Sequence, residues 1–230
     1  MKCAVMQPYL FPYLGYYQLV YAVDKFVFYD DVNYIKGGFI NRNNILANGT
    51  SQRFTIPINQ ASSFKKISEL SFSENVRKQL ISIEQAYSKA PYFKDVFPII
   101  QKVLSSDNRD VTYVCRQSIE AVFLYLGIEK STLLSSDLDY SRDQSAADKL
   151  VSIAGVLNCN EYVNSPGGKE LYNKAYFKER GVDLSFIEMR LVEYPQGSDK
   201  DFLPYLSMID VLMWNDKDSV TSFLNKYALI

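Results

Sequence analysis

The side chains best suited to chemistry follow the ends of apolar segments. Two carboxylates, Asp30 and Asp31, come after the largely apolar run 25–29, and the cations Lys36 and Arg42 follow them. A carboxylate at a strand end could bind a sugar hydroxyl or act as a general base, which makes Asp30, Asp31 and Lys36 candidate catalytic residues. Because neighbouring strand side chains point to opposite faces, we expect one aspartate to meet substrate and the other to meet Lys36 or Arg42. The alternative interpretation is a solvated turn with surface ion pairs.

A loop rich in tyrosine and proline, residues 7–16, follows the apolar run 3–6. Its two prolines fix φ and remove donors, so an ordered loop is expected. Tyrosine offers a flat apolar face and a hydroxyl, which suits a sugar or a base. Gln7, Tyr9 and Tyr13 are therefore predicted to bind substrate, and Tyr16 to assist catalysis. The alternative is an aromatic loop that only packs against a sheet.

A Gly-Gly turn between an expected strand and an expected helix marks a third candidate site. Backbone N–H groups at a helix start can hold an anion, and Ser165 and Lys169 flank Gly167 and Gly168. This turn is the best candidate phosphate site, with a simple helix cap as the alternative. The predicted substrate-binding residues outside the loop are Asn41, Arg42, Asn164, Ser165, Gly167, Gly168, Lys169, Tyr172, Gln196, Ser207 and Asp210.

Asp210 lies inside an apolar helical run, where an aspartate is usually paired or faces solvent. Ser207, three residues earlier, could share its helix face. The Gln196 side chain could form a hydrogen bond with an amide or a hydroxyl of a ligand. We expect this last segment to contribute to the same site as the first three.

Composition removes several classes of chemistry. The 230 residues contain no histidine, which excludes Ser-His-Asp and Cys-His catalysis and histidine metal sites. Three widely spaced cysteines show neither metal spacing nor a disulfide framework, so a cytoplasmic protein is expected. A net charge of −1 gives no argument for nucleic acid, and no apolar stretch reaches the roughly 18 residues of a membrane span.

The elements that must position these residues alternate along the chain. Strands are predicted at 3–6, 25–29, 51–58, 131–136, 161–164 and 182–189, and Asn48-Gly49 is a hairpin signal. Helices are predicted at 16–23, from a Ser71/Glu74 capping box to about 87, at 92–104 and 111–126, from a Ser141/Gln144 capping box to about 157, and at 168–180, 202–214 and 219–227.

This alternation predicts an α/β fold, with a Rossmann-like, mostly parallel sheet flanked by helices. The length of 230 residues suits a single domain, residues 1–230. The segment 61–106 interrupts the alternation and is predicted to be a helical insertion or lid. The segments after residue 200 are predicted to be C-terminal helices that pack on the sheet.

Two family resemblances rest on these motifs. Phe11-Pro12-Tyr13-Leu14-Gly15-Tyr16 is similar to the signature loop of HIGH-type nucleotidylyltransferases, with Tyr13 and Tyr16 where that family has histidines. The wider pattern resembles the WbqC-like family, and it departs from that family's usual basic-then-aromatic pair at Gly37-Gly38-Phe39. The segments that carry this second resemblance are 7–16, 29–32, 40–43, 55–57, 164–172, 194–196 and 206–210.

The WbqC-like resemblance implies a setting in O-antigen or other surface-polysaccharide biosynthesis. We therefore expect a transferase that modifies a nucleotide-linked amino sugar by N-acyl or aminoacyl transfer. Its partners would be a nucleotide sugar and an acyl-thioester donor, carried by CoA or an acyl carrier, with no certain cofactor. The alternatives are a nucleotidylyltransferase-like enzyme, which would need Mg²⁺, and a non-catalytic nucleotide-sugar-binding protein.

Overall fold

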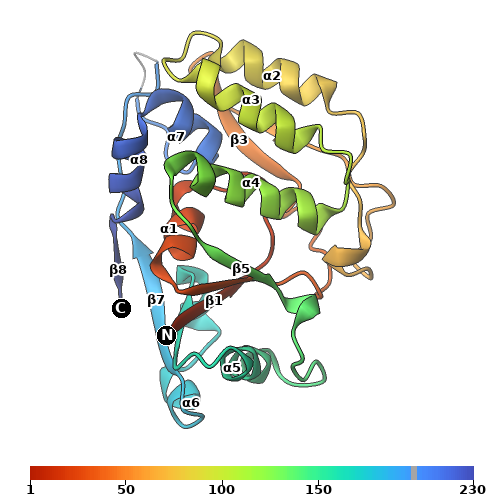
Figure 1. Cartoon of the computed structure of the whole chain (residues 1–230), viewed down its shortest axis with the longest axis vertical. Helices are drawn as coiled ribbons and strands as arrows, with labels where there is room; N and C mark the ends of the chain where they lie inside the picture. Colours follow the sequence, from red (N-terminus) through yellow and green to blue (C-terminus); the bar gives the residue numbers. More distant parts are fainter. Residues whose placement is uncertain (198–200) are drawn as a thin grey trace.

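A six-stranded sheet forms the centre of the computed structural model, which describes residues 1–197 and 201–230 (Figure 1). The strands lie in the order β5-β2-β1-β6-β7-β8, and all neighbours are parallel except β7 and β8. Their bounds are β1 Lys2–Met6, β2 Lys25–Phe28, β5 Ser131–Leu134, β6 Glu161–Asn164, β7 Asp183–Met189 and β8 Tyr227–Leu229. The prediction of an α/β fold with a mostly parallel sheet is confirmed.

The strand order creates a crevice at one edge of the sheet. Counted along the chain, the five parallel strands follow the order 3-2-1-4-5, so the winding reverses between β1 and β6. Connections leave these two neighbours in opposite directions, which opens a gap at their carboxyl ends. Gln7 and Ser165, the residues that follow β1 and β6, lie at this point.

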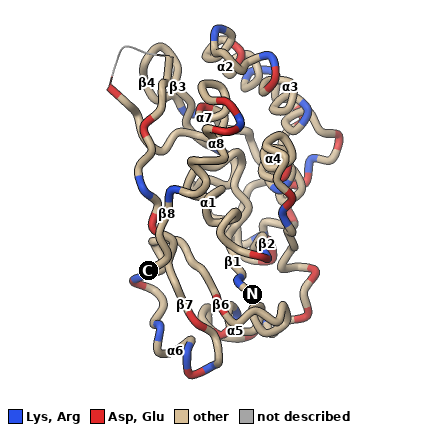
Figure 2. The backbone as a smooth tube through the Cα atoms, turned by 60° about the vertical axis from the view of Figure 1, so that its left-hand side comes forward, with Lys and Arg blue, Asp and Glu red and all other residues tan. Residues whose placement is uncertain are grey.

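Two apolar layers cover the two faces of the sheet because strand side chains alternate. Cys3 and Val5 point into a layer that α5 (Ala146–Val156) and α6 (Lys174–Lys178) complete. Ala4 points into the larger layer on the other face, with α1 (Leu14–Ala22) and α4 (Val111–Leu126). Near-complete burial of β1 and β2, which lie between α1 and α5 (Figure 2), explains why residues 3–6 and 26–28 are continuous apolar runs.

The segment between β2 and α4 adds a hairpin and two helices (Figure 1). Strands β3 (Arg42–Ala47) and β4 (Thr50–Thr55) are joined by Asn48 and Gly49, whose φ angles of 53° and 69° fit the predicted two-residue turn. Helices α2 (Arg77–Tyr87) and α3 (Phe93–Leu104) follow, and α3 packs on α4. Short 3₁₀ turns occur at η1 (Ile67–Glu69), η2 (Ser135–Asp137) and η3 (Pro166–Glu170).

The predicted capping boxes at Ser71 and Ser141 are wrong. Ser71 bridges to Asp110 in extended conformation, and α2 begins only at Arg77. Ser145, not Ser141, caps α5 by accepting a hydrogen bond from the amide of Asp148. In both cases a long-range contact outweighs the local capping signal. At Ser71 this contact is made by the backbone, and at Ser141 it is made by the side chain of the next residue.

The predicted bounds of three helices in the C-terminal half of the chain are also wrong. The helix over 168–180 is the turn η3 followed by the short α6, because the Asn173 side chain caps a new start at Ala175 and Tyr176. The helix predicted over 202–214 shortens to α7 (Met208–Trp214), since Tyr205 has φ of 60°.

The helix predicted over 219–227 is α8 (Lys217–Leu224), and strand β8 takes the remainder. The strand predicted over 51–58 likewise shortens to β4. Within the described residues, no helix combines the length and apolar character needed to cross a bilayer.

Candidate functional site

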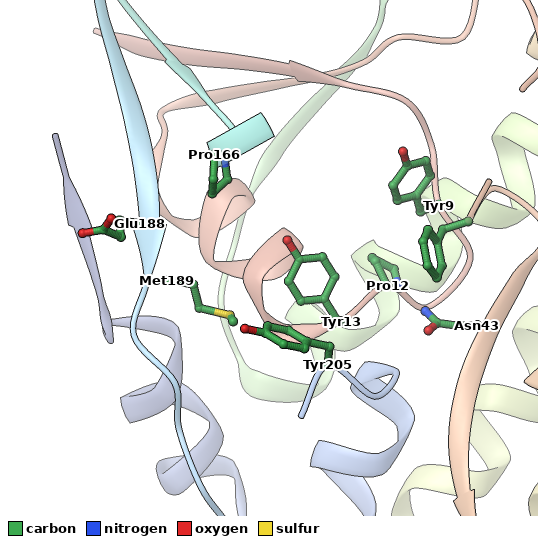
Figure 3. Close-up of a pocket in the computed structure, with 9 residues that line it drawn as sticks. Tyr9, Pro12, Tyr13, Asn43, Pro166, Glu188, Met189 and Tyr205 are labelled. Atoms are coloured by element: carbon green, nitrogen blue, oxygen red, sulfur yellow. The ribbon is translucent and has the colours of Figure 1, made fainter. Parts of the chain in front are cut away.

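A cavity of about 320 Å³ opens at the carboxyl ends of β1, β6 and β7. Segments that are far apart in the sequence meet there, and Figure 3 shows the rings of Tyr13 and Tyr205 beside Met189 with Tyr9 opposite. This is the crevice where open α/β sheets bind ligands. The residues lining it are Tyr9, Pro12, Tyr13, Phe39, Asn43, Pro166, Glu188, Met189 and Tyr205.

The loop between β1 and α1 is fixed at Phe11. Phe11 has φ of 40° directly before Pro12, a conformation that both its own side chain and the following proline disfavour. Its amide donates to Ser118 Oγ at 3.0 Å. Its carbonyl accepts from Asn43 Nδ2 at 2.7 Å and from Ser207 Oγ at 2.6 Å. Such strain, of order 1–3 kcal/mol, persists only where the surroundings over-determine the backbone.

The two asparagines around Arg42 are framework residues. Asn43 is buried and also donates to the Leu10 carbonyl, so its amide spans two successive carbonyls of the loop. Asn41 accepts from the Tyr34 hydroxyl and donates to the Ile56 carbonyl. Of the two, Asn43 also lines the cavity, whereas Asn41 lies behind it.

The tyrosines of the loop divide into two kinds. Tyr16 is buried and its hydroxyl donates to the Gln7 carbonyl at 2.8 Å. Burial raises its pKa well above 10, so it keeps its proton and holds the loop. Tyr9 and Tyr13 line the cavity, and within the described residues their hydroxyls have no hydrogen-bond partner. Burial raises the pKa of both as well, which makes them hydrogen-bond donors at neutral pH.

The adjacent aspartates follow β2 and bind residues that follow β5. This hydrogen-bond network does not line the cavity. Asp30 is buried and accepts from the Ser136 amide and from Ser136 Oγ. Asp31 accepts from the Tyr140 hydroxyl and from Arg142 Nε at 2.8 Å. Its cation is therefore Arg142, not Lys36 or Arg42 as predicted. The two carboxylates fasten the loop after β5 to the sheet.

Lys36 lies in the loop between β2 and β3, and Arg42 is the first residue of β3. Lys36 is exposed and forms no ion pair within the described part of the chain. Arg42 donates from Nε to the Gly38 carbonyl, next to the cavity residue Phe39. The Gln7 side chain, at the carboxyl end of β1, is half-buried.

The Gly-Gly turn reaches the cavity through Pro166. Asn164 is buried under the turn and accepts from the Ser165 amide, and a side chain on Gly168 would lie 2.5 Å from Asn164 Nδ2. Gly167 is exposed, with nothing within 4 Å of the position a Cβ would occupy. The five-residue turn replaces the helix start on which the phosphate prediction depended.

Lys169 and Tyr172, which follow the Gly-Gly turn, are not among the residues that line the cavity. Lys169 pairs with Glu188 at 3.6 Å, and both side chains are largely exposed. Tyr172 packs against Phe177 on the α6 side of the sheet. Within the described residues, no group of three acidic, cysteine or histidine side chains is placed to hold a metal ion.

Asp210 is completely buried, does not line the cavity, and joins Tyr194 and Gln196 to the rest of the protein. It accepts from the hydroxyls of Tyr87 at 2.7 Å and Tyr194 at 2.9 Å, and from Gln196 Nε2. Gln196 in turn exchanges two hydrogen bonds with the backbone of Leu203. Burial raises the pKa of Asp210 to about 6. Asp210 and Gln196 therefore position the segment that carries Tyr205, and Ser207 caps α7 beneath Phe11.

Sequence reasoning missed several wall residues, namely Pro12, Phe39, Asn43, Pro166, Glu188, Met189 and Tyr205. Pro12 lay inside the predicted loop, and Met189 ends a predicted strand, so the rule that sites follow strand ends could have found both. Phe39 and Tyr205 depend on folding of distant loops and carried no comparable signal.

Replacing Asn43 with aspartate should strongly destabilise the protein. The change removes two donors and places a carboxylate against the carbonyl oxygens of Leu10 and Phe11. We expect the free energy of unfolding, measured in urea, to fall by about 3 kcal/mol. Asn44→Asp is the matched control, because the Asn44 side chain is half-buried and makes no comparable bond. Equal losses in the two variants would contradict the role given to Asn43.

Asp210 should give the protein a specific pH dependence. A carboxyl whose pKa is higher in the folded state stabilises the fold at low pH, and this contribution is lost as pH rises through about 6. The free energy of unfolding of the wild type, relative to Asp210→Asn, should therefore fall by roughly 2 kcal/mol between about pH 4.5 and about pH 7. Urea titrations of both proteins measure this difference, and parallel pH profiles would refute it.

Comparison with known proteins identifies a family and a relative of this chain. One relative is the Mycobacterium tuberculosis protein named "Uncharacterized protein Rv1507c", 26% identical over 215 residues that span 92% of each chain. No solved structure gives a significant match. The sequence model of the WbqC-like protein family matches residues 7–222, a range that contains the loop, both asparagines, the Gly-Gly turn and Asp210. The chain belongs to the WbqC-like protein family.

Proposed function

We propose that this protein is a transferase that modifies a nucleotide-linked amino sugar, by N-acyl or aminoacyl transfer, in O-antigen or surface-polysaccharide biosynthesis. The cavity at the carboxyl ends of β1, β6 and β7 is the observation that carries the proposal. Its position is the one where related sheets hold nucleotides, and its tyrosine and proline walls suit a ring with apolar faces.

The chemistry available at the cavity favours direct transfer between two bound substrates. Cys3, Cys115 and Cys159 are all buried and line none of its wall, and Ser207 is a buried helix cap. A covalent intermediate would need an accessible, activated nucleophile. In direct transfer the neutral sugar amine attacks the acyl thioester, the C–N bond forms as the C–S bond breaks, and the proton lost from nitrogen passes to solvent or to the leaving thiolate. Holding both substrates in position can lower the barrier by about 7–11 kcal/mol.

Tyr16 fits this reaction as a positioning residue, because its hydroxyl holds the loop that carries Tyr9 and Tyr13. Asp30 and Asp31 are engaged by hydrogen bonds inside the protein and hold the loop after β5, which is not among the segments that line the cavity. Lys36 is exposed on a loop beside Phe39, where an anionic donor such as an acyl-CoA or an acyl-carrier thioester could meet it.

One observation favours the nucleotidylyltransferase alternative. The tyrosine-proline loop follows β1 and opens α1, which is where HIGH-type enzymes carry their signature. With Tyr13 and Tyr16 in place of histidines, Mg²⁺ held largely by the substrate phosphates would have to neutralise the charge. Release of pyrophosphate from a nucleoside triphosphate and a sugar phosphate, dependent on Mg²⁺, would select this alternative over acyl transfer.

The Gly15→Ala variant tests whether the cavity is the binding site. A Cβ on Gly15 would lie 2.4 Å from Tyr13 Cε2 and 3.0 Å from Met189 Sδ, so it must displace two wall residues. We expect the affinity for a UDP- or dTDP-linked amino sugar to fall about tenfold or more, measured by calorimetry and thermal shift. The helix propensity of alanine offsets part of the cost in stability.

Gly155→Ala in α5 is the control, because nothing lies within 4 Å of its Cβ position. This variant should bind as the wild type does and be slightly more stable. Unchanged affinity in Gly15→Ala would remove the cavity as the site. Nucleotide-sugar binding without turnover of any acyl thioester would leave a binding protein rather than an enzyme.

A further inference from the structure

The cavity presents hydroxyl donors that nothing inside the protein uses. Tyr9 and Tyr13 make ring contacts, to Tyr16 and Phe39 and to Tyr205 respectively, but no hydrogen bond through their hydroxyls within the described residues. Neither hydroxyl oxygen is among the fully enclosed unpaired atoms, so both are accessible to solvent, and both residues line the cavity. Tyr16, in the same loop, shows the contrasting case of a hydroxyl committed to a backbone carbonyl.

Among the described residues, the wall carries no charge directed inward. Glu188 is the one charged residue among them that lines the cavity, and Figure 3 shows its carboxylate turned away from Tyr13 and Tyr205. That carboxylate pairs instead with Lys169. A phosphate or carboxylate inside the cavity would therefore lose water without gaining a cation, which is strongly unfavourable.

The two phenols are donors at any physiological pH. Desolvation raises the pKa of Tyr9 and of Tyr13, and in Tyr13 the neighbouring phenols of Tyr9 and Tyr205 act in the same direction. A ligand that satisfies them must offer acceptors such as carbonyl or hydroxyl oxygens. Between these polar points the wall is formed by rings, Pro12 and Met189, which pack on flat apolar faces.

We infer that the cavity seats an uncharged ring bearing hydrogen-bond acceptors, either the base or the sugar of a nucleotide sugar, with the hydroxyls of Tyr9 and Tyr13 donating to it and the phosphates outside. The inference rests on the proposed function for the identity of the ligand. The neutral part of that ligand is then enclosed in the cavity. Its anionic part remains in solvent or contacts exposed cations near the cavity entrance.

Tyr9→Phe and Tyr13→Phe test the inference, because each removes a hydroxyl and keeps the ring. The free energy of unfolding should stay the same, since no internal bond is lost. Affinity for UDP- and dTDP-N-acetylglucosamine, measured by calorimetry, should fall about three- to tenfold in each variant, as expected for one lost hydrogen bond. Tyr16→Phe is the matched control, in which stability falls because the bond to the Gln7 carbonyl is lost.

Two further ligands distinguish the base from the sugar. Uridine or thymidine that binds the wild type and loses affinity in both phenylalanine variants places the base in the cavity. The methyl glycoside of N-acetylglucosamine with the same behaviour places the sugar there. Nucleotide sugars that bind both variants as tightly as the wild type would overturn the inference and leave the proposed function standing. Uncharged rings that bind with this dependence, when nucleotide sugars do not bind at all, would support the inference and overturn the proposed function.

Discussion

The hydrogen bonds on the main chain of Phe11 are the constraint on which the candidate site depends. A left-handed residue directly before a proline is unstable in isolation, and here three separate parts of the chain hold it: Ser118 of α4, Asn43 of β3 and Ser207 before α7. Because these contacts also join the hairpin, α4 and α7 to the loop, the cavity wall forms only when the whole fold is assembled. The loop is therefore pre-organised, which reduces the entropy lost when a ligand binds.

This dependence changes what the polar motifs mean. Asn41, Ser207, Gln196 and Asp210 look like ligand contacts in the sequence, yet most of their hydrogen-bonding capacity is used inside the protein. The first three, like Asn43, satisfy backbone groups of loops, whereas Asp210 accepts hydrogen bonds from buried side chains. The residues left to meet a ligand are mainly the tyrosines, the prolines and one methionine.

The sequence was sufficient for the fold class because the relevant signals are local. Apolar runs such as 3–6 and 25–29 are typical of buried parallel strands, and Asp110 and Gly127 mark the two ends of α4 as their residue types predict. Capping boxes failed where long-range contacts competed. Ser71 is held extended by its bridge to Asp110, and Arg142 leaves the predicted helix start to reach Asp31.

The site was predictable only in part for the same reason. The loop 7–16 and the turn at 166–168 could be placed at one edge of the sheet because each follows a predicted strand of a mostly parallel sheet. The partner of Asp31 could not, because Arg142 lies more than a hundred residues away along the chain. The sequence also does not show which tyrosines support the fold and which line the cavity. That division depends on which hydroxyl forms a hydrogen bond with a carbonyl after folding.

The pairing of β8 with β7 has a consequence for how the cavity can be observed. Tyr227 lies opposite Met189 in this antiparallel ladder, and Ile230 and Phe186 exchange backbone hydrogen bonds. Met189 belongs to the cavity wall, so an occupant that restrains its strand also restrains the partner strand. The backbone amide of Ile230, which donates to the Phe186 carbonyl, thus forms a remote reporter, whose exchange with deuterated water slows when the cavity is filled.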